Sequence, residues 1–320
     1  MIPQTELLNI YLMAFSIRNV ELTISENYYK ELVRCPVHLS IGQEMVPSIF
    51  SSLDNPKDLA VSTHRGHAHF LGKRGSIRRL FDEIHGLPTG CSGGNGGSMH
   101  LIDTDNGFMG STAIVANTVP IGVGMSEAQN LLTNNNSITT IFMGEGATEE
   151  GVFYESLNYA KIRNLPCIFV IENNNFSVYT SLEPRQGKLN LEKKINGFCV
   201  NYIFVDNHNY MLLHNKWSHA LDDVRNGKGP YVIEVMTHRY REHCGPNFDD
   251  HLNYRDETFL KKWKKLDILD LLKNDLIDSG IQESYLSKKE DQIFKFIKNE
   301  YKNSEINYLK KREKMNKTRV

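Results

Sequence analysis

The stretch 138-ITTIFMGEGATEEG-151 joins an apolar run to a turn in which one acid, Glu145, stands between two glycines. The apolar run has the composition of a buried strand, and apolar residues recur at helical spacing from Val152 onward. A second apolar run follows at 167-CIFVIE-172. A strand, a helix and a strand in so short a segment form a βαβ unit, which requires parallel strands and a right-handed crossover. The predicted strand, turn, helix and strand cover 138–143, 144–148, 149–163 and 167–172.

The rest of the chain fits an α/β protein with a helical end. Apolar residues at helical spacing predict four further helical regions, 5–34, 212–227, 259–273 and 290–303. An apolar run predicts a strand over 231–240, and the glycine-dense region 86–124 indicates backbone in unusual dihedrals or close to a ligand, with a flexible linker as the alternative. The basic end, 309–320, is expected to be a frayed terminus rather than a binding tail. We assign 1–256 to an α/β domain and 257–320 to a helical extension of the same domain.

Composition limits the class of protein and its partners. The 320 residues are enough for a sizeable core, and 40% apolar with 23% charged residues is ordinary for a globular chain. The net charge of −1 gives no reason to expect nucleic acid or a membrane surface as a partner. We see no apolar stretch near the ~20 residues that span a bilayer. The five cysteines form no CxxC pair, which indicates free thiols and a cytoplasmic location.

Oxygen-bearing side chains follow both strands of the βαβ unit. Glu145 follows the first strand, and the three asparagines 173–175 follow the second. Ligands of open α/β sheets bind at the carboxyl ends of strands, so these side chains are expected at one edge, whether the strands are adjacent or one strand apart. Carboxylate and amide oxygens suit Mg²⁺ or Ca²⁺, and a phosphate completes such a shell. The glycines beside Glu145 let phosphate oxygens approach backbone N–H groups.

Two common phosphate-binding motifs are absent from the sequence. It contains no GxxxxGK[ST], and 144-GEGATE-149 lacks the third glycine of GxGxxG, which argues against a dinucleotide site. On spacing alone, a metal–phosphate site and a helix cap beside surface asparagines are both open. Glu149, Glu150 and Glu155 fit acids that favour a helix N-terminus.

A family resemblance extends this interpretation. The segments 144-GEGA-147 and 172-ENN-174 are similar to the two halves of the thiamine diphosphate motif, usually GDG followed by NN. Five more segments resemble, in the same order, the α subunits of thiamine-diphosphate-dependent 2-oxo acid dehydrogenases, the family of the pyruvate, branched-chain and acetoin enzymes. They are 37-VHLSIGQEMV-46, 63-THRGHAHFLGKRG-75, 94-GNGGSMHL-101, 112-TAIVANTVPIGVG-124 and 227-GKGPYVIEVMTHRYREH-243. The resemblance covers most of the chain and implies a three-layer thiamine-diphosphate-binding fold, with a mainly parallel sheet and helices on both faces.

The resemblance also implies a metal and diphosphate site. Its metal ligands would be Glu145, the side chain of Asn174 and the main-chain oxygen of Phe176. The ion would be Mg²⁺, with Mn²⁺ or Ca²⁺ as alternatives. Gly146 and Ala147 would lie against the diphosphate of the cofactor.

Further residues follow from the same matching segments. Arg65 would pair with the diphosphate, as a forked and permanently charged donor suits. His64 stands where these α subunits commonly have tyrosine. His38 matches a histidine near the 2-oxo acid, and His243 one near the cofactor that helps to stabilise reacting oxygens or the diphosphate. The main chain facing the aminopyrimidine would be that of Ala113 and Val115.

The resemblance covers only the diphosphate-binding half of such enzymes. It implies that a separate β subunit carries the pyrimidine-binding domain and its glutamate, in an assembly of two α and two β chains. The implied reaction is decarboxylation of a small 2-oxo acid and transfer of the acyl group to a lipoyl acyltransferase. A carboligase or transketolase-like transfer without a lipoyl partner is the alternative, and a non-catalytic subunit with a decayed metal site is a third.

The sequence departs from the family pattern at two places. Glutamate at position 145 replaces the usual aspartate and is one methylene longer, which would move the ion by ~1 Å and favour a larger one. The loop 240-YREHCGPNFDD-250 differs from the serine-bearing loop of pyruvate dehydrogenase α subunits, and Cys244 stands where a serine would be. Three imidazoles in 64-HRGHAH-69 offer a separate metal site as an alternative.

Overall fold

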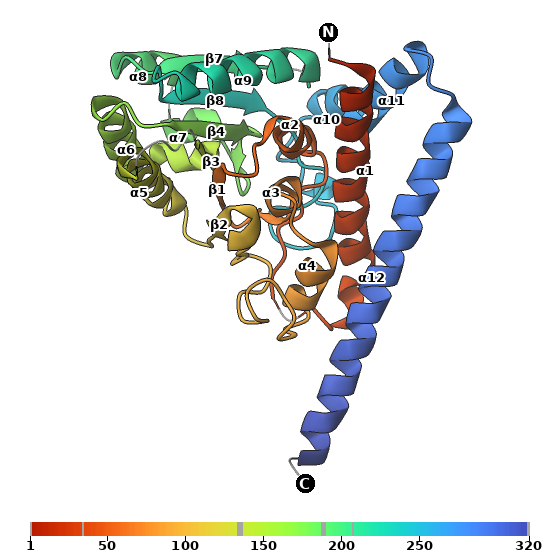
Figure 1. Ribbon diagram of the computed structural model, residues 1–320. Helices are drawn as coiled ribbons and strands as arrows, with labels where there is room; N and C mark the ends of the chain where they lie inside the picture. The colour runs from red at the N-terminus through yellow and green to blue at the C-terminus, as the bar shows by residue number, and fades with distance from the viewer. Residues whose placement is uncertain (1, 34, 133–136, 187–189, 207, 319–320) are drawn as a thin grey trace.

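A computed structural model describes residues 2–33, 35–132, 137–186, 190–206 and 208–318 (Figure 1). Its centre is a sheet of six parallel strands in the order β2-β1-β3-β4-β8-β7. The strands span Leu59–Ser62 (β1), Phe108–Ser111 (β2), Thr139–Gly144 (β3), Cys167–Asn173 (β4), Asn201–Val205 (β7) and Tyr231–Met236 (β8). The predicted βαβ unit is confirmed, and β3 and β4 are direct neighbours, with Gly144 opposite Glu172. The strand predicted over 231–240 is shorter, because the chain leaves the sheet after Met236.

Helices cover both faces of the sheet, which confirms the predicted three-layer α/β class (Figure 1). Successive side chains of a strand point to opposite faces of the sheet, so alternate residues pack into two different hydrophobic cores. Ile141 and Met143 of β3 pack with α5 (Thr118–Leu131) and α6 (Gly151–Ile162), whereas Phe142 packs on the opposite face. That face is covered by α2 (Met45–Leu53) and α9 (Tyr210–Arg225), and α1 (Gln4–Asn27) packs against α2.

The remaining elements are short or lie at the C-terminal end. The helices are α3 (His67–Gly72), α4 (Ile77–Ile84), α7 (Leu182–Gln186), α8 (Leu191–Gly197), α10 (Glu257–Lys265), α11 (Ile268–Asp278) and α12 (Glu283–Thr318). Two-residue strands β5 (Phe176–Ser177) and β6 (Thr180–Ser181) form a small antiparallel pair. Single 3-10 turns cover Tyr28–Lys30, Thr104–Asn106, Glu145–Glu149 and Asp250–Leu252.

Three predicted helix boundaries are wrong. The first helix ends at Asn27 rather than at 34, because a 3-10 turn follows and Glu31 adopts a left-handed backbone with φ of 56°; residue 34 lies outside the described residues. The helix predicted over 259–273 is two helices, since the Asp267 side chain accepts a hydrogen bond from Leu269 N and begins α11. Helix 149–163 begins at Gly151, after the 3-10 turn.

The C-terminal segment is a helix and not a frayed end. Helix α12 runs beside α1 and continues to Thr318, beyond the rest of the fold (Figure 1). Tyr308 is buried with Leu32 and Leu87, and the Lys311 ammonium donates to the carbonyl oxygen of Gly86 at 2.7 Å. The first contact holds the helix just before the segment predicted to be frayed, and the second anchors that segment itself. Residues 319–320 lie outside the described residues.

The glycine-dense region is an ordered loop built around a buried acid. Glu83, at the end of α4, accepts hydrogen bonds from the backbone N–H groups of Ser92, Gly94, Gly96 and Gly97 at 2.7–3.1 Å. Gly94 has φ of 77°, and a Cβ there would lie 2.5 Å from the Leu87 carbonyl oxygen. The prediction of unusual dihedrals is therefore confirmed here, and the flexible-linker alternative is wrong.

Helix α1 corrects the expectation that no apolar stretch is near the length that spans a bilayer. With the turn that follows it, the segment Gln4–Lys30 is long and apolar enough to cross a membrane by length and composition. Half of its most apolar window is buried inside the protein, and the buried residues recur at helical spacing, from Leu7 through Ala14 to Ile24. A core helix passes the same test, and α1 packs against α2, α11 and α12.

Candidate functional site

The carboxyl ends of four adjacent strands, β1, β3, β4 and β8, meet at one cavity of about 270 Å³. The loops after these strands deliver, in turn, His64 and Arg65, the Glu145 turn, the 174–178 segment and His243. Parallel strands bring their loops to one edge of the sheet, which explains why residues so distant in the chain share a cavity. The lining includes Gln43, Thr63, His64, Arg65, Val115, Ala116, Gly144, Glu145, Gly146, Ala147, Glu149, Glu150, Glu172, Asn174, Phe176, Ser177, Val178 and His243.

Glu145 is a buried carboxylate at the first turn after β3. Its side chain forms an ion pair with Arg185, at 2.8 Å between Oε1 and Nη2, and Arg185 also contacts Glu149. Burial raises the pKa of the Glu145 carboxyl to about 6, and the Arg185 charge opposes that shift. Sequence reasoning missed Arg185, because nothing in 181-SLEPRQ-186 marks an arginine that folds back onto the turn.

Only one of the three asparagines after β4 lines the cavity. The Asn174 Oδ1 atom accepts from the Phe176 backbone N–H at 3.1 Å, and both residues face the cavity. Asn173 is turned away, because its amide donates to Glu234 and its Oδ1 accepts from Asn175 N. An amide oxygen accepts through two lone pairs, so Asn174 retains one for a second partner.

Arg65 is buried beside the cavity and joins three loops. Its guanidinium donates to the carbonyl oxygens of Leu39 and of His243, the latter at 3.1 Å. Burial lowers the pKa of Arg65 to about 10, which leaves it charged at neutral pH. Two of its five N–H donors are used in these bonds, and three are available to an anion.

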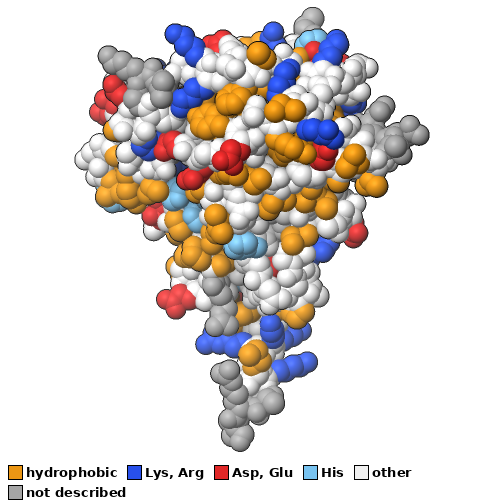
Figure 2. Space-filling model, turned by 90° about the vertical axis from the view of Figure 1, so that its left-hand side faces the viewer, with side chains coloured by type: hydrophobic (Ala, Val, Ile, Leu, Met, Phe, Trp, Pro, Cys, Tyr) orange, Lys and Arg blue, Asp and Glu red, His pale blue; other side chains and the backbone are white. Residues whose placement is uncertain are grey.

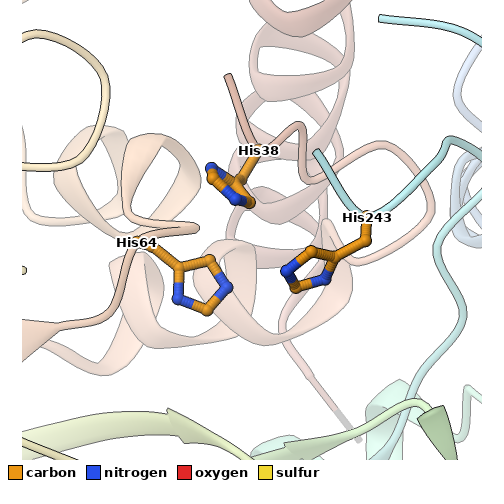
Figure 3. Close-up of side chains that lie close together, drawn as sticks. All are labelled: His38, His64 and His243. Carbon is orange, nitrogen blue, oxygen red and sulfur yellow. The ribbon is translucent and has the colours of Figure 1, made fainter. Parts of the chain in front are cut away.

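Three imidazole rings gather at the edge of the cavity. The rings of His38, His64 and His243 have centroids 4.6–5.4 Å apart and come from three different loops (Figure 3). Burial lowers the pKa of each ring, to about 2, 4 and 3 respectively, and the neighbouring Arg65 charge acts in the same direction. All three are therefore neutral imidazoles at physiological pH.

The metal site proposed within 64-HRGHAH-69 does not form. His67 lies between Glu21 and Ser98, at 3.1 and 2.7 Å, and His69 bonds Ser62 at 2.8 Å. Both rings are held by structural partners in different directions, whereas His64 turns toward His38 and His243.

Most of the predicted site residues line the cavity, and two of them do not. Those that line it are His64, Arg65, Val115, Glu145, Gly146, Ala147, Asn174, Phe176 and His243. His38 lies behind the wall, against the rings of His64 and His243. Ala113 is exposed and outside the lining, and Ala116 stands there instead, with φ of 61°. Glu172, which closes β4 and lies 3.1 Å from His69, is a further lining residue that sequence reasoning missed.

The donor set fits a hard divalent cation with a phosphate. A carboxylate, an amide oxygen and main-chain oxygen at one cavity are the ligands that Mg²⁺ prefers, and the adjacent arginine suits a bidentate phosphate contact. The Glu145 carboxylate is already paired with a cation, Arg185, so any metal ion there must share or replace that partner.

Comparisons with known proteins identify the family of the chain. The family described as dehydrogenase E1 component matches residues 13–312. The chain is 32% identical to the pyruvate dehydrogenase E1 component subunit alpha of Zymomonas mobilis over 92% of this chain and 82% of that protein. It is 34% identical to the protein of the same name in Rickettsia felis, over 84% and 81%, and 33% identical to that of Porphyra purpurea, over 83% and 78%.

Proposed function

The chain belongs to the dehydrogenase E1 component family, as an α subunit of the thiamine-diphosphate-dependent 2-oxo acid dehydrogenases, and we propose that its cavity binds the diphosphate of thiamine diphosphate through a divalent metal ion. One observation carries this proposal. Oxygen donors and a buried arginine converge on a single cavity at the carboxyl ends of four adjacent parallel strands. Ligands of open α/β sheets bind at this edge.

Each lining residue has a proposed task. Glu145, Asn174 and the Phe176 carbonyl oxygen would ligate the metal. Arg65 would donate to the diphosphate, beside the N–H groups of Gly146 and Ala147. Space at Gly146 supports this role, because even an added Cβ would meet nothing nearer than 3.5 Å.

The histidines have tasks in the reaction of the bound substrate. Thiamine diphosphate supplies a nucleophilic carbon and an electron sink for decarboxylation. His243, on the cavity wall, and His38, behind it, are neutral and so can donate a hydrogen bond or accept a proton at an imidazole nitrogen. We propose that they orient the 2-oxo acid and stabilise its oxygens. His64 would contact the diphosphate end in the place that tyrosine commonly occupies.

A partner subunit is part of the proposal. Figure 2 shows groups of hydrophobic side chains on the side of the molecule where α5 and α6 lie. Exposed members of these elements and of the loop before α5 are Ile114, Val115, Ile121, Leu131, Tyr159 and Ile162. Exposed apolar patches mark interaction sites, and Val115 joins this surface to the cavity. We propose that a β subunit covers it and completes the site in the cytoplasm, in an assembly of two α and two β chains.

Replacement of Asn174 by alanine is expected to abolish metal-dependent cofactor binding. The substitution removes a proposed metal ligand and frees the Phe176 N–H, so we expect the Kd for thiamine diphosphate to rise at least about 100-fold. Calorimetric titration of the cofactor into the αβ assembly, with and without Mg²⁺, measures the effect.

The matched control is Asn201→Ala, an exposed asparagine on the edge strand β7. It should bind the cofactor as the unaltered assembly does. Cofactor binding that is equally tight in both variants, or absent from the unaltered assembly, would contradict the proposed site.

The length of Glu145 predicts an altered choice of metal. Shortening it with Glu145→Asp draws the carboxylate back by about one methylene, or ~1 Å, and weakens its reach to Arg185. We expect the unaltered protein to bind the cofactor more tightly with Mn²⁺ or Ca²⁺ than with Mg²⁺, and the variant to shift the ratio of these affinities toward Mg²⁺ by about tenfold. Parallel titrations with the three ions test this; an unchanged ratio contradicts it.

The acceptor of the acyl group is a separate part of the proposal. We propose transfer to a lipoyl acyltransferase, on the strength of the relatives' names. The loop 240–250, which differs from the family pattern and holds His243 beside the cavity, favours the carboligase alternative. If the assembly reduces an isolated lipoyl domain in the presence of a 2-oxo acid, the result supports transfer to a lipoyl acyltransferase. If it condenses two carbonyl substrates without a lipoyl domain, the result supports the carboligase alternative.

A further inference from the structure

His38, His64 and His243 form a cluster that contains none of the proposed oxygen ligands of the metal. Figure 3 shows the three rings around a common space, and one nitrogen of each lies within 4.8 Å of the others. In the part of the chain that the structure describes, it is the one group of three histidine, cysteine or acidic side chains so placed.

The ring nitrogens are available as ligands. His38 Nδ1 is buried and has no hydrogen-bond partner among the described residues. Such an orphaned polar atom costs free energy, and a metal ion satisfies it. A metal binds only the unprotonated imidazole, and all three rings have a lowered pKa because of burial and the Arg65 charge.

The backbone already holds the three segments together. Gly245 N donates to Val37 O at 2.8 Å, which joins the segment of His38 to the loop of His243, and Arg65 joins both to the loop of His64. A tetrahedral ion with metal–nitrogen bonds of about 2.0–2.1 Å needs nitrogens about 3.4 Å apart. Because the nitrogens lie within 4.8 Å of one another, side-chain rotation must shorten these distances by up to about 1.4 Å. The Arg65 charge opposes a cation here, which limits the affinity without changing the geometry.

We propose that His38, His64 and His243 bind one transition-metal ion such as Zn²⁺, at a site separate from the oxygen-ligated metal site. Three imidazoles select zinc, nickel, copper or cobalt over magnesium, whereas Glu145 and Asn174 have the reverse preference. The fourth ligand position faces the cavity, where a water completes the shell. An ion here occupies the two histidines assigned to the 2-oxo acid, so it inhibits the assembled enzyme; this consequence alone rests on the proposed function.

Zn²⁺ binding by the full chain tests the site without any activity assay. Equilibrium dialysis with Zn²⁺ in excess Mg²⁺ is expected to give one tightly bound ion per chain. His64→Gln is expected to weaken its binding at least about 100-fold, since it removes one of three ligands. Co²⁺ as a probe should give the strong visible absorption of a tetrahedral ion, which the variant loses.

The control is His219→Gln, which removes an exposed imidazole on α9 whose partner is Asp223. It should retain the ion, as should Asn174→Ala, which loses only cofactor binding. His243→Gln, checked for folding by circular dichroism, provides a second variant that should lose it. Absence of a bound ion from the unaltered chain, or equal binding by His64→Gln and His219→Gln, overturns the proposal. Zn²⁺ binding by the chain, together with failure of the αβ assembly to bind thiamine diphosphate, counts against the proposed function and not against this site.

Discussion

Replacement of Glu83 by glutamine is expected to lower the free energy of unfolding by about 4 kcal/mol or more. Each carboxylate oxygen of Glu83 accepts two backbone N–H bonds, from Ser92 and Gly94 on one side and from Gly96 and Gly97 on the other. A glutamine keeps one oxygen and turns an NH₂ group toward the other two donors. Two part-buried N–H groups then lose their partner, at about 1–3 kcal/mol each, and the remaining bonds lose their charge.

Urea unfolding followed by circular dichroism measures this loss. The matched control is Glu155→Gln on the exposed face of α6, where a change within about 0.5 kcal/mol is expected. A Glu83→Gln protein as stable as the control would show that the loop 90–97 does not depend on the carboxylate. The loop lies at the edge of the fold and not in the cavity, so cofactor binding should survive wherever the variant is folded.

Replacement of Asp249 by alanine is expected to cost about 3–5 kcal/mol of stability and to weaken the cavity wall. Asp249 is buried between Arg239 and Arg255 and accepts a hydrogen bond from Tyr254 at 2.6 Å. Its removal leaves Arg239 without an acidic partner in the interior, which is the costly half of a broken buried ion pair. Arg239 also donates to the carbonyl oxygen of Val178, a lining residue, so the Kd for thiamine diphosphate should rise as well.

A second substitution distinguishes the stability lost through an unpaired buried charge from the stability lost through poorer packing. Adding Arg239→Met to Asp249→Ala removes the cation that loses its acidic partner, whereas Arg255 still pairs with Asp250, so the double variant should regain part of the lost stability. Asp222→Ala, at an exposed position on α9, is the control and should unfold like the unaltered protein. If the double variant is as unstable as the sum of its two single changes, the unpaired charge of Arg239 is not the cause.

The site was predictable as far as its residues lie on regular elements. Glu145 and Asn174 follow two strands whose apolar pattern is evident in the sequence, and parallel strands force their ends to one edge. Val115 lines the cavity and Ala113 does not, because the loop before α5 has no periodic pattern to fix which residues face inward. The terminal helix was misjudged for a related reason, since its anchors, Tyr308 and Lys311, pack on residues far away in the chain.

The sequence by itself determined the α/β class, the βαβ unit, the oxygen donors at the strand ends and the family. Strands and helices follow from local periodicity of burial, which a linear pattern records. Only the tertiary structure decided that Arg185 pairs with Glu145, that Glu83 organises the glycine-rich loop, and that three histidines share one space. Such contacts join side chains from separate loops, whose conformations depend on what the rest of the fold packs against them, and no local pattern encodes that.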